Sequence, residues 1–110
     1  MPSTDYSLEK DLKEVIEGEV RFDRVSRSLY ATDASVYQIV PQGVVIPRTP
    51  QDVITTLLMC RMHGVPITAR GGGTSQAGQA IGEGIQLDFS KYMNAIIEFR
   101  PDDALVRVQP

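Results

Sequence analysis

The feature that most constrains the fold is a succession of strand, helix and strand signals between residues 44 and 69. Val44-Val45-Ile46 is a β-branched run closed by Pro47, which is typical of a buried strand bounded by a residue that cannot continue it. Thr49-Pro50-Gln51-Asp52 follows, and it supplies an N-cap, a proline at the first helical position and an acidic first turn. The sequence therefore predicts a helix directly after the strand.

The predicted helix ends at Gly64, and a second strand follows it. Its expected apolar stripe consists of Val53, Ile54, Leu57, Leu58 and Met62. Residues 65–69 read as a strand that begins beside a proline. A strand, a helix and a strand in so short a space usually join parallel neighbours by a right-handed crossover. We expect an α+β fold, α/β-like in character, with a small sheet, this βαβ unit and flanking helices.

The remaining elements are predicted from shorter signals. Ser7 can cap a helix whose apolar residues are Leu8, Leu12, Val15 and Ile16, with Gly18 as a stop. Residues 21–37 have no clean period, so we expect a short strand or an irregular connection there. Residues 85–88 form a third candidate strand and residues 90–94 a turn. Residues 96–99 and 104–108 are expected to form a hairpin around Pro101-Asp102-Asp103.

Composition excludes several classes of protein. A net charge of -3 and a pI near 5.0 give no electrostatic footprint for nucleic acid. One cysteine cannot build a disulfide framework or a cysteine metal site, and no metal site is predicted. No apolar run approaches the roughly 18 residues of a membrane helix, and the polar start does not resemble a signal peptide. We expect a cytoplasmic protein without a transmembrane segment.

A glycine-rich loop carries the chemistry. Six of the nine glycines fall between Gly71 and Gly84, directly after the second strand. Consecutive glycines allow positive φ and can bring main-chain N–H groups to one concave point that binds phosphate oxygens. Thr74 and Ser75 add hydroxyl donors, and Arg70 adds a positive charge. We interpret the loop as a phosphate site, with a surface loop that binds nothing as the alternative.

Two common phosphate motifs do not fit these residues. Gly73 and Gly78 have P-loop spacing, but Gln79-Ala80 follows where lysine and a hydroxyl residue are needed. A dinucleotide fingerprint that starts at Gly71 needs glycine at position 76, which is Gln76, and no amphipathic helix follows. There remains a loop between two strands that contacts a pyrophosphate chiefly through main-chain N–H groups.

Five blocks in the stretch from residue 30 to residue 109 resemble one flavoprotein family. They are Tyr30-x-x-Asp33-x-Ser35-x-Tyr37, Pro41-x-x-Val44-Val45-x-Pro47, Gly64-Val65-Pro66-Ile67, Arg70-Gly71-Gly72-Gly73-Thr74-Ser75-x-x-Gly78-Gln79-Ala80 and Leu87-Asp88-x-Ser90-x-x-Met93-Asn94. They resemble the vanillyl-alcohol oxidase / p-cresol methylhydroxylase family, in particular the FAD-linked oxidase branch with glycolate oxidase D subunits and D-lactate dehydrogenases.

The resemblance implies a fold and a set of cofactor contacts. Residues 1–29 would be an N-terminal helix and lead-in. Residues 30–110 would be the first subdomain, incomplete at its C-terminus, of a PCMH-type FAD-binding domain. The loop would wrap the FAD pyrophosphate, and the strand-end proline would lie beside the cofactor. The implied cofactor-binding residues are Pro47, Arg70, Gly71, Gly72, Gly73, Thr74, Ser75, Gln76, Ala77, Gly78 and Gln79.

The resemblance also implies an activity for a longer parent protein. The parent would be a flavin-dependent oxidoreductase that oxidises a small 2-hydroxy acid such as D-lactate or glycolate, cytoplasmic or peripheral to the inner membrane. Its remaining subdomains would carry the substrate and catalytic residues, so none is assigned here and the 110-residue chain alone would be inactive. Some relatives attach FAD through a histidine where this chain has Thr74, so we expect non-covalent FAD.

Other polar residues are predicted to be structural. His63 lies at the end of the predicted helix, where it suits the helix dipole, and Cys60 reads as a small core residue. Asp33 is expected to hold a turn or a helix start. Asp88 and Glu83 are poor acid/base candidates, because a carboxylate would repel a pyrophosphate.

The alternative to the enzyme hypothesis is a non-catalytic nucleotide-binding module or an inactive fragment.

Overall fold

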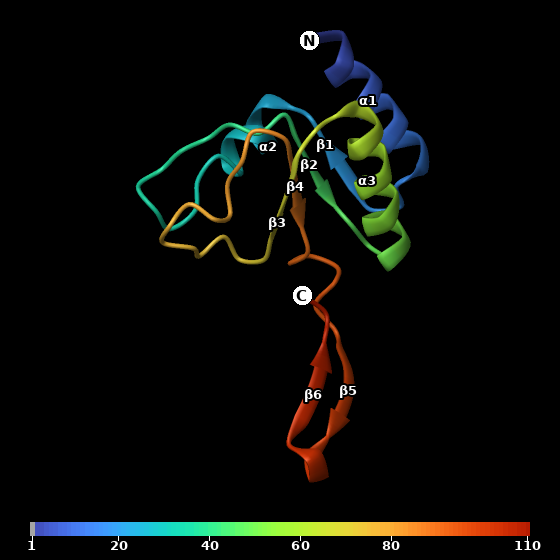
Figure 1. The fold of residues 1–110 in the computed structure, drawn as a ribbon, viewed down its shortest axis with the longest axis vertical. Coiled ribbons are helices and arrows are strands. Elements are labelled where there is room, and N and C mark those ends of the chain that lie inside the picture. The colour runs from blue at the N-terminus through green and yellow to red at the C-terminus, as the bar shows by residue number, and fades with distance from the viewer. Residues whose placement is uncertain (1) are drawn as a thin grey trace.

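The computed structural model describes residues 2–110, with side-chain environments from Ser7 onward. Three helices, a four-stranded sheet and a separate hairpin make up the fold (Figure 1). In chain order the elements are α1 Pro2–Val15, β1 Glu19–Arg21, α2 Arg24–Leu29, β2 Gly43–Ile46, α3 Pro50–His63, β3 Ile67–Arg70, β4 Ile85–Asp88, β5 Ile96–Arg100, the 3-10 turn η1 Pro101–Asp103 and β6 Leu105–Val108.

The four-stranded sheet has the order β1-β2-β4-β3. Both β2 and β3 run parallel to β4, whereas β1 pairs antiparallel with β2. The predicted α+β class and the parallel relation of the first two strands are confirmed. The expectation that they are neighbours is wrong, because β4 lies between them and hydrogen-bonds to both. Local sequence signals could not reveal this order, because β4 follows the glycine-rich loop in the sequence and is distant from both β2 and α3 along the chain.

The two faces of the sheet have different coverings. Successive residues of a strand point to opposite faces, so Ile85 and Leu87 of β4 face the core built with α1 and α3. Helices α1 and α3 pack against each other on that face (Figure 1). The opposite face, which Gln86 and Asp88 occupy, is covered by the loops. The buried members of the core are Leu8, Leu12, Val45, Cys60, Val65, Ile85, Leu87, Phe89 and Met93.

Helix α1 begins earlier than the sequence predicts. It starts at Pro2, so Ser7 lies inside the helix and the expected cap there is wrong. Leu8 and Leu12 are fully buried and Ile16 packs against the core, as predicted, but Val15 is half exposed. The N-terminal segment therefore contributes to the core of the sheet.

Helix α3 has the predicted ends but not the predicted face. The Thr49 hydroxyl accepts a hydrogen bond from the N–H of Asp52, and Gly64 ends the helix at φ 68°. Of the expected stripe only Val53 packs against the core. The other members are wrong, because Ile54, Leu57, Leu58 and Met62 are 49–81% exposed. The buried face instead carries Asp52, Thr56 and Cys60. Thr56 satisfies its hydroxyl inside the helix by donating to the carbonyl of Asp52 at 2.7 Å.

Helix α2 lies in the segment that was expected to be a strand or irregular. Asp23 caps it by accepting from the N–H and the hydroxyl of Ser26 at 2.9 and 2.8 Å. The helix has six residues, which is too short for a recognisable 3.6-residue period. The short strand β1 precedes it and shares only Arg21 with the segment, so the strand lies earlier than the prediction placed it.

The hairpin was predicted at the observed place. Strands β5 and β6 pair antiparallel around η1, and the ribbon extends away from the sheet (Figure 1). Phe99 pairs with Val106 on one face, and Glu98 pairs with Arg107 on the other. All of its residues are exposed.

The buried carboxylate of Asp52 joins two turns of the backbone. Asp52 is 2% exposed. Its Oδ1 accepts from the N–H of Glu17, and its Oδ2 accepts from the N–H groups of Gly18 and Arg48, all at 2.9 Å. The carboxylate also lies in the first turn of α3, where the helix dipole favours negative charge. It therefore fixes the turn before β1 to the turn before α3.

We predict that Asp52→Asn lowers the free energy of unfolding by about 2 kcal/mol, because one carboxylate oxygen becomes an NH₂ group facing backbone donors. Urea unfolding measures the change. Asp102→Asn makes the same chemical change at an exposed position of η1 and should leave stability nearly unchanged. Equal stability of the two variants would contradict this role of Asp52.

A second carboxylate, that of Glu19 on β1, accepts hydrogen bonds from several side chains. Its carboxylate accepts from Lys91 Nζ and the Tyr92 hydroxyl, both at 2.5 Å, and forms an ion pair with Arg21. These hydrogen bonds, that of Lys91 foremost, lower the pKa of Glu19 to about 2 from its ordinary value of 4.5. Since Lys91 and Tyr92 follow β4, the ionised carboxylate ties the segment after β4 to the edge strand.

We predict an acid-dependent contribution of Glu19 to stability. Its folded pKa is depressed, so the ionised group stabilises the fold above pH 4.5, and the contribution disappears as the pH falls towards 2. Glu19→Gln should therefore unfold at lower urea concentration than the parent sequence at pH 7, with the difference closing between pH 4.5 and 2. A difference independent of pH would refute the assignment.

Candidate functional site

The glycine-rich loop is the crossover between two parallel neighbours in the sheet. It runs over residues 71–84, from the end of β3 to the start of β4. Parallel strands need a long connection, and in most proteins that connection is a helix. Here it is irregular, as predicted, and it extends from the side of the sheet away from α1 and α3 (Figure 1).

Several main-chain donors of this loop have no internal acceptor. Within residues 2–110, no hydrogen bond uses the N–H of the residues Gly72, Gly73, Thr74, Ser75, Gln76 and Gly78. Gly73 and Gly78 have φ values of 70° and 77°, which only glycine adopts readily. The backbone thus presents a series of N–H groups to a ligand with several acceptor oxygens.

The hydroxyls of the loop have different surroundings. Ser75 Oγ accepts from the N–H groups of Ala77 and Gln79, both at 3.2 Å, so this side chain shapes the turn that follows it. Thr74 and Gln76 are exposed and free to face a ligand. Ser75 therefore acts within the loop, and Thr74 is the better placed hydroxyl donor.

A second segment, residues 30–40, lies beside the loop (Figure 1). Asp33 Oδ1 accepts from the N–H of Ser35 at 2.8 Å, and its Oδ2 accepts from the N–H of Ala80 at 3.3 Å. The Ser35 side chain is the first cause that lowers the pKa of Asp33, and the N–H groups of Ser35 and Ala80 lower it further. The expected turn at Asp33 is confirmed, but its contact with the loop is a role that sequence reasoning missed.

Tyr37 brings an aromatic ring against the same loop. A Cβ built on Gly78 would lie 3.0 Å from Cδ2 of this ring, so the loop passes closely over it. Tyr37 remains 59% exposed. The Asp33-x-Ser35-x-Tyr37 spacing was the available signal for this second wall.

The two remaining predicted site residues are not at the loop surface. Pro47 follows β2 and is fully buried, at the edge of the sheet where β2, β4 and β3 all have their carboxyl ends. Arg70 turns its guanidinium inward, and Nη1 donates to the carbonyl of Ala80 at 3.0 Å. Neither side chain points a charge or a donor into solvent beside the glycines.

A hollow of about 230 Å³ opens at the carboxyl edge of β3 and β4. It is lined by Ala69, Arg70, Gly71, Phe89 and Pro110. In sheets with parallel strands, ligands commonly bind outside the carboxyl ends of the strands. The hollow leads from this edge onto the start of the glycine-rich loop.

Asp88 is occupied by structural contacts. It accepts from the Tyr30 hydroxyl and from the N–H and hydroxyl of Ser90 at 2.8 and 2.7 Å. Burial, and then the hydrogen bond to Asp88, raise the pKa of Tyr30 above its usual range. The prediction that Asp88 is not an acid/base group agrees with this geometry.

The lone histidine and cysteine also have structural places. His63 Nε2 lies 2.9 Å from Asp11 Oδ2, so it joins α3 to α1. Cys60 is 1% exposed, and burial raises the pKa of its thiol to about 11. Among the side chains that the structure describes, those of residues 7–110, there is no group of three or more His, Cys, Asp or Glu able to hold a metal ion. The same residues contain no helix long and apolar enough to cross a membrane.

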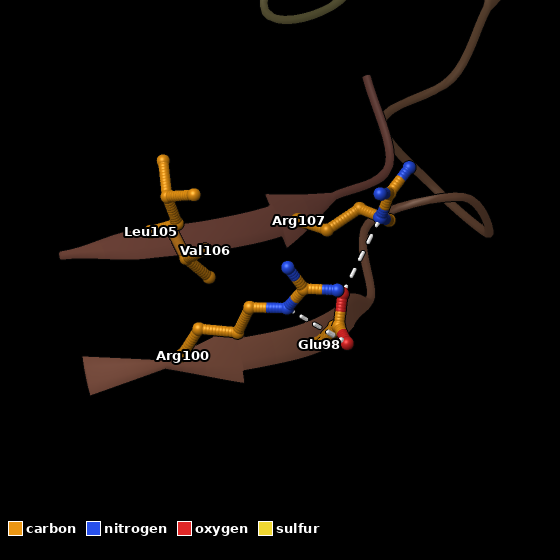
Figure 2. A pocket seen from close by; sticks show the side chains of 5 residues that line it. All are labelled: Glu98, Arg100, Leu105, Val106 and Arg107. Carbon is orange, nitrogen blue, oxygen red and sulfur yellow. Dashed lines mark ion pairs between the residues drawn. The ribbon is translucent and has the colours of Figure 1, made fainter. Parts of the chain in front are cut away.

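A second pocket lies on the hairpin, far from the loop in the chain. Figure 2 shows Glu98 between Arg100 and Arg107, with Leu105 and Val106 beside them. The carboxylate is 3.1 Å from Arg100 Nε and 3.6 Å from Arg107 Nε. The single carboxylate is shared by two guanidinium groups on an exposed ribbon, and the lining contains no hydroxyl, thiol or amine that could act as a nucleophile.

Comparison with known proteins gives consistent matches. Residues 41–110 match a family model described as FAD binding domain. The chain is 39% identical over 113 residues to D-2-hydroxyglutarate dehydrogenase of Pseudomonas putida, and the match covers 98% of this chain and 11% of that protein. It is 34% identical over 110 residues to glycolate oxidase subunit GlcD of Bacillus subtilis, covering 94% of this chain and 23% of that one.

A solved structure agrees on the fold. The chain superposes on p-cresol methylhydroxylase with a TM-score of 0.72 at 17% identity, over 93% of this chain and 21% of the other. The resemblance seen in the five sequence blocks is therefore confirmed. The chain spans between about a tenth and a quarter of the length of these relatives.

Proposed function

Because this chain belongs to the FAD binding domain family, we propose that its glycine-rich loop holds the FAD pyrophosphate in a flavin-dependent dehydrogenase that oxidises a small 2-hydroxy acid. The observation that carries the proposal is the set of main-chain N–H groups at residues 72–76 and 78 that lack an internal acceptor. FAD supplies the redox step, since flavins accept a hydride equivalent. The residues of this chain bind and orient the cofactor.

The donor set of the loop fits a pyrophosphate. Neutral N–H groups and the Thr74 hydroxyl can donate to several phosphate oxygens at once. A Cβ built on Gly71 meets nothing within 4 Å, so the first turn of the loop is open to a ligand. Glu83 is the one charged residue between 71 and 84, and it stands at the far end near β4. The proposed contacts are therefore made by the backbone of Gly71–Gln79.

We propose that FAD is held without a covalent bond. Thr74 lacks the imidazole through which some flavoproteins attach the cofactor. The only histidine, His63, is paired with Asp11 between α3 and α1. The affinity of the protein for FAD then depends on contacts with the loop and with the hollow at the carboxyl edge of β3.

The substrate and the rest of the enzyme are inferred from the relatives. Two matching proteins are named as a D-2-hydroxyglutarate dehydrogenase and a glycolate oxidase subunit, and both substrates are 2-hydroxy acids. The hairpin supports a larger assembly: Phe99 and Val106 form an apolar face that is more than half exposed, and an isolated two-stranded ribbon is only marginally stable. We propose that the remaining subdomains cover this face and supply the catalytic residues.

We expect the longest natural polypeptide that contains this chain to show a flavin absorbance spectrum. Acid precipitation should leave the chromophore in the supernatant, as dissociable FAD. Anaerobic addition of D-2-hydroxyglutarate, D-lactate or glycolate should bleach the flavin. Bound flavin that none of these acids reduces would favour a non-catalytic nucleotide-binding module, and a colourless protein that takes up no FAD would refute the proposal.

Gly72 offers a matched test of the pyrophosphate position. A Cβ added there meets only Thr74 Cγ2 at 3.6 Å, so a side chain fits without a clash. We predict that Gly72→Asp abolishes retention of FAD, because the carboxylate repels the phosphates. Gly72→Asn has the same shape without the charge and should lose much less affinity. The measurement is flavin content per polypeptide after gel filtration, and equal content in both variants would contradict the placement.

A further inference from the structure

The Arg70 guanidinium lies beneath the glycine-rich loop, where it contacts main-chain carbonyls. Nη1 donates to the carbonyls of Ala80 at 3.0 Å, Thr32 at 3.4 Å and Tyr30 at 3.5 Å, and Nη2 also donates to Thr32 at 3.4 Å. The Arg70 Cζ is 5.1 Å from the centre of the Tyr30 ring. One side chain therefore joins the end of β3, the segment 30–32 and residue 80 of the loop.

Both main-chain polar groups of Ala80 are hydrogen-bonded to side chains around the loop. With the amide of Gln86 oriented to satisfy both its atoms, Nε2 donates to the Ala80 carbonyl at 2.8 Å and Oε1 accepts from the Gly82 N–H at 3.1 Å. Gln86 is fully buried on the central strand. The Ala80 N–H donates to Asp33. The loop is thus anchored at its second half by Arg70, Gln86 and Asp33.

The first half of the loop passes directly over the same guanidinium. A Cβ built on Gly73 would lie 1.9 Å from Arg70 Nη2, and Gly73 has a left-handed φ of 70°. The backbone at residue 73 can approach this closely only because it carries no side chain. The guanidinium is enclosed between Gly73 and the three carbonyls.

We propose that Arg70 is a positioning residue for the pyrophosphate site and is not one of its ligands. This inference rests on the proposed function of the loop. The donors of Arg70 are directed to carbonyls, so its role is to hold residues 72–78 in the shape that aims their N–H groups at one ligand. A long irregular loop otherwise loses conformational entropy when it binds, and ordering it in advance increases affinity.

A substitution of Asp33 distinguishes an anchoring role of the network from a purely electrostatic effect on anion binding. The carboxylate brings negative charge close to the loop through its contact with Ala80. If net charge decided the affinity, Asp33→Ala would strengthen anion binding. If anchoring decides it, the same variant weakens binding, because the Ala80 N–H loses its acceptor.

The test uses the FAD-free form of the longest natural polypeptide that carries this chain. The variants are Arg70→Gln, Arg70→Lys and Asp33→Ala, with Arg61→Gln on the exposed surface of α3 as the control. Amide hydrogen exchange is measured at Gln79, Ala80 and Gly82, whose N–H groups are hydrogen-bonded within the site. Binding of FAD and of inorganic pyrophosphate is measured at several salt concentrations.

We expect all three site variants to accelerate exchange at Ala80 and Gly82 without altering exchange in α3. They should weaken FAD binding by about 10- to 100-fold, which corresponds to the loss of one charge-assisted hydrogen bond. The slope of log Kd against log salt concentration should stay unchanged in Arg70→Gln, since no charged contact with the ligand is removed. Arg70→Lys should not restore binding, because an ammonium cannot span the carbonyls as the planar guanidinium does.

Other outcomes would overturn the inference. Arg70 would be a direct ligand if exchange in the FAD-free Arg70→Gln protein were unchanged while affinity and salt dependence both fell, or if Arg70→Lys restored binding. Tighter binding by Asp33→Ala would show that charge prevails over anchoring. A parent sequence that binds neither FAD nor pyrophosphate would refute the proposed function, and the exchange data would still decide whether Arg70 anchors the loop.

Discussion

The parallel pairing of β3 with β4 is the constraint on which the site depends. Since neighbouring parallel strands begin at the same edge, the chain must return the full length of β3 before β4 can start. A crossover helix would satisfy its own backbone groups on the way. The irregular crossover 71–84 does not, so its N–H groups either find side chains or remain available. The same topological requirement therefore creates both the loop and its capacity to bind a ligand.

The two faces of the sheet are held to their coverings by different interactions. On the helix-covered face the core is closed by apolar residues and by one carboxylate, Asp52, whose oxygens satisfy the turns before β1 and α3. On the opposite face, Val44 pairs with Gln86 and is fully buried. The polar side chains of Gln86 and Asp88 on β4 are directed there at loop backbone and at Tyr30. Because Gln86 and Asp88 each make several hydrogen bonds, polar contacts add to apolar packing in fixing the loops on this face.

The sequence predicted those features that depend on nearby residues. The cap at Thr49, the end of α3 at Gly64 and the hairpin around η1 are local, and all three are confirmed. The order of the strands depends on where β4 inserts, which no local pattern encodes. The apolar stripe of α3 was wrong for a related reason: Asp52 and Thr56 are buried because their partners lie in the backbone, whereas a hydropathy pattern assigns polar residues to solvent.

The position of the glycine-rich loop was predicted from the sequence, but the residues that hold it in place were not. Glycine spacing located the loop, and the failed P-loop and dinucleotide patterns indicated main-chain contacts. A charged residue beside glycines reads as a phosphate ligand, so the inward course of the Arg70 side chain was not foreseeable. Gln86 was the neglected signal, because an amide between the apolar residues Ile85 and Leu87 must find partners once it is buried.

The position of β4 has a consequence for the order in which the sheet can assemble. Within the parallel part of the sheet, β2 and β3 each pair only with β4, yet β4 is the last of the four strands in the chain. During synthesis, β3 and the loop must therefore leave the ribosome without a pairing partner, while β1 and β2 can already pair. The parallel sheet closes in one late, non-local step, which loop-closure entropy makes slow. β3 therefore remains an unpaired strand until β4 has been made.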